Sequence, residues 1–110
     1  MPVVKEVTYS PAKFREGVDR LLVTAIFAIS DTNLSGELQS IQLERAASAL
    51  EKSHLFNSTN KGEVFIENNK LILTLRYADI RGLGDFYSLC KKNADDIIEQ
   101  AEAFIKAVVP

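Results

Sequence analysis

The segment Arg76–Tyr87, RYADIRGLGDFY, carries the spacing that comes closest to a site for chemistry. Gly82 and Gly84 stand between a predicted strand and a predicted helix, where many proteins hold a phosphate group. The dinucleotide-binding pattern needs a third glycine where Tyr87 stands, and a further strand after the helix, which this sequence does not supply. Asp85 is placed to cap the helix, and its carboxylate would repel a phosphate. We therefore interpret the segment as a tight corner and expect no cofactor there.

Charged side chains flank this corner. Arg76, Asp79 and Arg81 form a polar rim that is suited to grip a segment of a partner protein. The simpler interpretation is a set of solvated charges, because an ion pair between Arg81 and Asp85 at a surface contributes little to stability. We retain the rim as a candidate partner-binding site.

Two further residues are candidates for catalysis. His54 is the only histidine, and no nucleophile or carboxylate can be assigned to it as a partner, so a half-buried or helix-capping role is simpler. Cys90 is the only cysteine and lies on an apolar helical stripe, which indicates a buried structural thiol. One cysteine excludes an intrachain disulfide and a cysteine-based metal site. We predict no catalytic residue, no metal site and no enzymatic activity.

The totals restrict the class of protein. The 110 residues fit one small domain, residues 1–110, and the formal net charge of -2 gives no general attraction to nucleic acid or to an anionic membrane. The most apolar run, Leu21–Ile29, is shorter than a membrane span, and the first residues lack the apolar core of a signal peptide. We expect a cytoplasmic protein without a membrane partner, for which nucleic acid is an unfavoured partner.

The first half of the chain predicts two N-terminal helices. Pro11 suits the first helical position after Ser10, and apolar residues at helical spacing extend this helix to about Ile29. Its second part, LLVTAIFAI, is apolar on every side, and its β-branched residues also permit a strand. A second helix, with one polar and one apolar side, runs from Glu37 to about Ser53.

The second half predicts a central β-hairpin over residues 62–77 and a long amphipathic helix over residues 85–109. A turn at Asn68 and Asn69 sets the hairpin register, because asparagine tolerates the positive φ of tight turns. One hairpin face is apolar and assigned to the core. The other is mostly polar, but Phe65 and Ile72 lie opposite one another at its centre.

The expected architecture is α+β: two helices, the hairpin and the final helix. An isolated hairpin is marginal in water, and its open edges would recruit other strands. Three solutions remain open: the N-terminal PVVKEVTY adds a strand, residues 21–29 form a strand, or two copies join their hairpins. With the wide apolar helix faces, these edges make a homodimer the leading hypothesis for completing the fold.

We expect a non-enzymatic protein-interaction module, such as an adaptor, a chaperone-like subunit or an inhibitor, that binds itself and another protein. Its candidate contact residues are Phe65, Ile72, Arg76, Asp79 and Arg81. One alternative is a small-molecule-binding or enzymatic domain with a pocket between the hairpin and the last helix, near Tyr77, Arg81 and Tyr87. Another is a nucleic-acid-binding regulator that uses Phe65 and nearby basic residues, although Glu63 and Glu67 share that face.

No motif identifies a family. The expected arrangement, with a sequence pI of about 5.4, is similar in general style to small acidic dimeric chaperones of bacterial secretion systems. Those proteins combine helices with a sheet and keep apolar faces for partners. The chain has fewer predicted strands than that fold.

Overall fold

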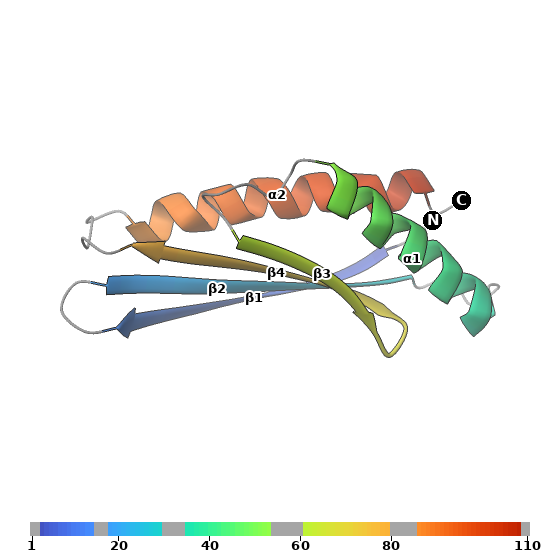
Figure 1. Ribbon diagram of the computed structural model, residues 1–110, viewed down its shortest axis with the longest axis horizontal. Coiled ribbons are helices and arrows are strands. Elements are labelled where there is room, and N and C mark those ends of the chain that lie inside the picture. Colours follow the sequence, from blue (N-terminus) through green and yellow to red (C-terminus); the bar gives the residue numbers. More distant parts are fainter. Residues whose placement is uncertain (1–2, 15–17, 30–34, 54–60, 80–85, 109–110) are drawn as a thin grey trace.

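A computed structural model describes residues 3–14, 18–29, 35–53, 61–79 and 86–108 of the chain. The elements follow in the order β1 (Val3–Phe14), β2 (Val18–Ile29), α1 (Gly36–Lys52), β3 (Lys61–Glu67), β4 (Lys70–Asp79) and α2 (Phe86–Val108). The four strands form one antiparallel sheet in the order β1-β2-β4-β3. Both helices lie on the same side of this sheet (Figure 1). The α+β class is confirmed.

The predicted helix over residues 11–29 is wrong, because these residues belong to β1 and β2. Along β2 the buried residues alternate with Leu22, Thr24, Ile26 and Ala28 on the other face, which is the period of a strand. Residues 21–29 are apolar on every side because β2 is a central strand, with the core on one face and a partly apolar surface on the other. Pro11 is tolerated because β1 is an edge strand.

The hairpin prediction is confirmed in its register. Glu67 pairs with Lys70, and Phe65 pairs with Ile72. Asn68 and Asn69 adopt φ angles of 51° and 62°, the left-handed values that a two-residue hairpin turn requires. The hairpin is not isolated, however, because β4 also pairs with β2 along most of its length. The sheet therefore reaches four strands within one chain, and the expectation that a second copy must complete the fold is wrong.

Two helices match the predicted ones closely. Ser35 caps α1, its side chain accepting a hydrogen bond from the Leu38 N–H at 3.3 Å, and the Ser53 N–H closes the other end on the Leu50 carbonyl. The final helix, α2, is amphipathic and 23 residues long. Its buried stripe includes Ala94, Ile98 and Ile105.

The core lies between the helices and one face of the sheet. Alternate residues of β2 and β4 project into it, with Val23, Phe27 and Leu73 each 0% exposed. On the helix side, α1 packs mainly over β3 and β4, whereas α2 packs mainly over β1 and β2. Small residues such as Ala46 and Ala101 are fully buried and allow close approach of the helices. The core thus uses one face of the sheet. The other face points away from the helices, and no described element covers it.

Candidate functional site

The sheet face opposite the helices is covered by no described element. We call it the outer face. It consists of the residues that alternate with the buried ones along each strand: Val4, Glu6, Thr8 and Ser10 of β1, Arg20, Leu22, Thr24, Ile26 and Ala28 of β2, Lys70, Ile72, Thr74, Arg76 and Ala78 of β4, and Glu63, Phe65 and Glu67 of β3.

An apolar row crosses three of the four strands of the outer face, β2, β4 and β3. Ile26 on β2 pairs with Ile72 on β4, and Ile72 pairs with Phe65 on β3. Phe65 is 43% exposed, and the two isoleucines are half-buried by their neighbours. Cross-strand apolar neighbours of this kind stabilise a sheet, but here they also leave a contiguous hydrophobic strip in contact with solvent.

A threonine row lies beside the apolar row. Thr8, Thr24 and Thr74 occupy successive strands at the same level, and Glu63 follows on β3. The Thr74 Oγ1 atom is buried, and within the residues that the structure describes it has no hydrogen-bond partner. A buried hydroxyl without a partner destabilises a fold by its lost hydration.

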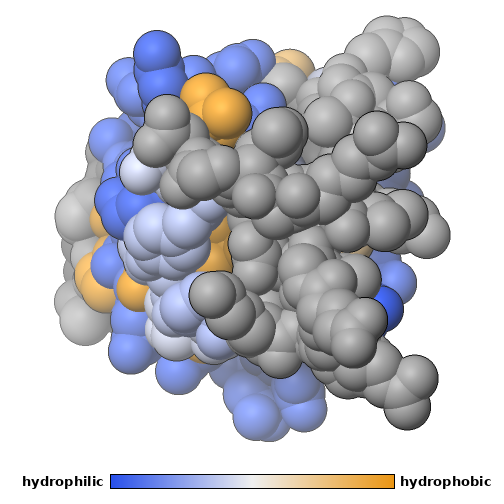
Figure 2. Space-filling view, turned by 90° about the vertical axis from the view of Figure 1, so that its left-hand side faces the viewer, coloured by the Kyte–Doolittle hydropathy of each residue, from blue (hydrophilic) through white to orange (hydrophobic). Residues whose placement is uncertain are grey.

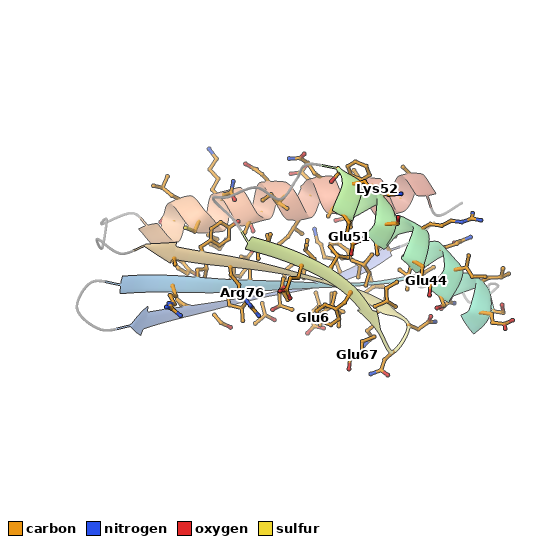
Figure 3. All side chains as sticks on the ribbon, viewed as in Figure 1. Glu6, Glu44, Glu51, Lys52, Glu67 and Arg76 are labelled. Atoms are coloured by element: carbon orange, nitrogen blue, oxygen red, sulfur yellow. The ribbon has the colours of Figure 1, made fainter. Side chains whose placement is uncertain are left out.

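Charges on the outer face separate along the strands. Glu67 lies at the end that carries the β3–β4 turn, Glu6 and Glu63 follow further along, and Arg20 and Arg76 lie toward the other end. Figure 3 shows this spread, with Glu67 beside the turn, Arg76 toward the opposite end and Glu6 between them. Lys70 offsets part of the acidic end, since it pairs across the turn with Glu67. Among the described side chains, none of Glu6, Glu63, Glu67 or Arg76 forms an ion pair.

The surface at one end of the molecule is mixed in character. Figure 2 views the end that lies at the left of Figure 1, where small hydrophobic areas alternate with hydrophilic ones among the coloured residues. Other exposed apolar side chains lie on the helices, for example Leu38 and Ile41 on α1 and Leu89 on α2. The outer face differs from these because strand register aligns three of its apolar residues, Ile26, Ile72 and Phe65, in one row.

Three of the five predicted contact residues lie together on the outer face. Phe65 and Ile72 are directly paired, and Arg76 is exposed two steps further along β4. Asp79 ends β4, but its side chain lies outside what the structure describes, as does the whole of Arg81. The corner that contains Gly82, and His54 after α1, also lie outside the described residues.

The sequence interpretation missed the contribution of β1 and β2 to this site. Ile26 and Leu22 extend the apolar surface, and Glu6 adds an acidic group at its edge. The signal was the β-branched content of LLVTAIFAI, which permits a strand. The strand alternation was obscured because the residues on the outer face are themselves apolar.

A second polar region joins β1 to α2. Lys5 of β1 forms an ion pair with Glu102 at 2.8 Å, and Lys106 reaches the same carboxylate at 3.2 Å. The Tyr9 hydroxyl donates a hydrogen bond to Asp95, which also forms an ion pair with Lys91 at 3.3 Å. Lys5, Asp95, Glu102 and Lys106 border an open groove of about 550 Å³.

The contacts in this polar region shift the pKa values of Glu102 and Tyr9. Hydrogen bonding from Lys5 is the main reason that the pKa of Glu102 is lowered, with burial acting in the opposite sense and Lys106 lowering it further. Burial, together with the hydrogen bond to Asp95, raises the pKa of Tyr9 to about 12. The Lys91 ammonium lies 4.7 Å from the centre of the Tyr9 ring, a cation–π contact. The polar side chains between β1 and α2 thus bind one another.

The described residues offer little that resembles a catalytic centre. Tyr77 is buried, and its hydroxyl donates to Asn93 Oδ1 at 2.6 Å. Cys90 is half-buried against the core. Over the described ranges, no cluster of three or more histidine, cysteine or acidic residues could hold a metal ion. None of the helices, where described, is long and apolar enough to cross a membrane.

Comparison of the chain with models of known families, with curated proteins and with solved structures gives no match.

Proposed function

We propose that the chain is a non-enzymatic protein-interaction module that binds through the outer face of its sheet. The observation that carries this proposal is the apolar row of Ile26, Ile72 and Phe65 on a face that no described element covers. An adaptor, a chaperone-like subunit or an inhibitor would each use such a surface.

The composition of the outer face suits a protein partner. Binding energy in protein interfaces concentrates in a few central apolar or aromatic residues, while a polar rim excludes water and sets orientation. Phe65 is the aromatic candidate for an anchor, and its 43% exposure leaves surface for a partner to bury. Arg76 and Glu63 provide charged groups near the row. The two edge strands, β1 and β3, offer a second mode of contact through strand addition.

The β1–α2 groove gives weaker support to a small-molecule function. A ligand site usually combines an apolar pocket with a few convergent polar groups that are free to bind. Here the cations Lys5 and Lys106 already pair with Glu102, and Lys91 pairs with Asp95. These ion pairs indicate that the polar groups of the groove stabilise the packing of α2 on β1.

Site-specific photo-crosslinking tests the proposed function. p-Benzoylphenylalanine placed at position 65 in cells of the native host should give a discrete crosslinked protein product. The same probe at Glu44, an exposed position on the opposite side of the molecule, is the matched control and should not give it. An added Ile26→Asp substitution, which places a charge in the apolar row, should remove the product.

Equal crosslinking at positions 65 and 44, or none at position 65, would overturn the proposal. Circular dichroism of each variant is needed beside the crosslinking, so that loss of the product is distinguished from loss of the fold.

A further inference from the structure

We infer that the outer face binds a second copy of this chain, with the two sheets packed face to face and their strands running in opposite directions. This inference rests on the proposed function and names its partner. It does not concern completion of the sheet, which one chain already achieves with four strands. The distribution of charge over the outer face indicates that its partner is a second copy of the chain.

The outer face is complementary to itself. Its acidic residues, Glu6, Glu63 and Glu67, lie nearer the turn end than Arg20 and Arg76 do, and Lys70 offsets only one of these three negative charges. A two-fold axis that runs across the strands places the basic end of each copy over the acidic part of the other. Each favourable contact then occurs twice, as in any two-fold interface.

The opposite arrangement is disfavoured by the same charges. If the strands of the two copies ran in the same direction, the acidic part of one face would meet the acidic part of the other. Like charges brought together in an interface disfavour that docking mode strongly. Charge therefore selects the antiparallel mode, in which Arg76 of one copy approaches Glu63 of the other.

Two of these charges, Arg76 and Glu63, are available for a contact with a second copy. Within the described part of the chain they form no ion pair, although they lie on neighbouring strands. By contrast, Lys5, Lys91 and Lys106 on the helix side are engaged with acidic partners. Arg76 and Glu63 lie on the same outer face as the apolar row.

The face is also large enough. The strands β1, β2, β3 and β4 are 12, 12, 7 and 10 residues long. With a strand spacing of about 4.8 Å and a rise of about 3.3 Å per residue, the face has a projected area of roughly 650 Å². A standard interface removes about 800 Å² of accessible surface from each partner, and a corrugated side-chain surface exceeds its projection. Sheets packed in this way form a sandwich about 10 Å apart, with interdigitated side chains.

Mixing of two charge-reversed variants tests this arrangement. Arg76→Glu and Glu63→Arg each bring like charges together in a homodimer, so each should weaken self-association about tenfold or more. Mixed in equal amounts, the variants restore opposite-charge contacts, because the introduced glutamate of one chain meets the introduced arginine of the other. The mixture should therefore form heterodimers with an affinity close to that of the unmodified chain. An ion pair within one chain cannot produce this recovery.

Sedimentation equilibrium from about 1 µM to about 500 µM measures the association of each sample. Arg45→Glu and Glu44→Arg make the same charge changes at exposed positions on α1 and should leave the dimer unchanged. A mass of one chain at every concentration overturns the inference. A dimer that shows no recovery on mixing overturns the antiparallel charge-matched mode.

The proposed function is decided separately by the crosslinking at position 65. A crosslinked product with a different protein, together with a monomeric purified chain, would leave the interaction module standing and remove the second copy as its partner. Absence of any product at position 65 would remove the proposed function itself.

Discussion

Leu73 and Ile72 are neighbours on β4 that point to opposite faces, and replacing each by threonine tests the whole arrangement. Leu73 is 0% exposed in the core, whereas Ile72 is half-buried on the outer face. Threonine places a β-branched side chain at both positions, so strand propensity changes little at Ile72 and does not fall at Leu73.

The expected magnitudes differ several-fold. Leu73→Thr removes buried methyl groups, leaves a cavity and buries a hydroxyl, which together lower the free energy of unfolding by about 4 kcal/mol. Ile72→Thr loses cross-strand contacts with Phe65 and Ile26 on a partly solvated face, worth about 1 kcal/mol.

Urea unfolding followed by circular dichroism measures both changes. With a slope of about 1.5 kcal/mol/M, Leu73→Thr should lower the urea midpoint by about 2.5 M, and Ile72→Thr by less than about 1 M. If the outer face binds a second copy, the effect of Ile72→Thr should grow with protein concentration, because association stabilises the folded chain by mass action. A loss for Ile72→Thr as large as that for Leu73→Thr at low concentration would refute the assignment of inner and outer faces.

Two further substitutions test the hydroxyl groups of Thr74 and Tyr9. Thr74→Val removes a buried hydroxyl that lacks a partner among the described residues, so it should raise the free energy of unfolding by about 1 kcal/mol and the melting temperature by about 4 °C. An unchanged or lower melting temperature would show that the Thr74 hydroxyl is hydrogen-bonded in solution. The pKa of Tyr9 is raised to about 12, so the folded chain holds the proton of the Tyr9 hydroxyl more tightly than the unfolded chain does. The protonated hydroxyl therefore stabilises the fold fully below pH 10, and this stabilisation is lost as the pH rises through 12. Because Tyr9 is only partly buried, this is worth about 1 kcal/mol after allowance for solvent screening. The difference in unfolding free energy between the unmodified chain and Tyr9→Phe should therefore narrow between pH 10 and pH 12, and a constant difference would contradict the assignment.

The interaction surface was partly predictable. The hairpin alone places Phe65 opposite Ile72, because a two-residue turn at Asn68–Asn69 defines which residues pair. The contribution of Ile26 and Glu6 was not predictable in the same way. It depends on β2 pairing with β4, a contact between segments far apart in the chain.

Local patterns determined three elements of this protein from the sequence by itself: α1, the β3–β4 hairpin and α2. In each, the side chains that face the core recur at one period, and a cap or turn residue such as Ser35 or Asn69 marks a boundary of α1 and of the hairpin. The energies that specify these elements act between residues close in the chain, so the sequence displays them directly.

Only the tertiary structure decided the state of residues 11–29 and the exposure of the outer face. An apolar run without a clear period is compatible with a buried helix and with a central strand, and its backbone hydrogen bonds must go to whichever partner is available. Here β1 and β4 flank β2 on both sides and supply those partners. Once that pairing forms, both helices pack on one face of the sheet, and the row of Ile26, Ile72 and Phe65 is left on the other.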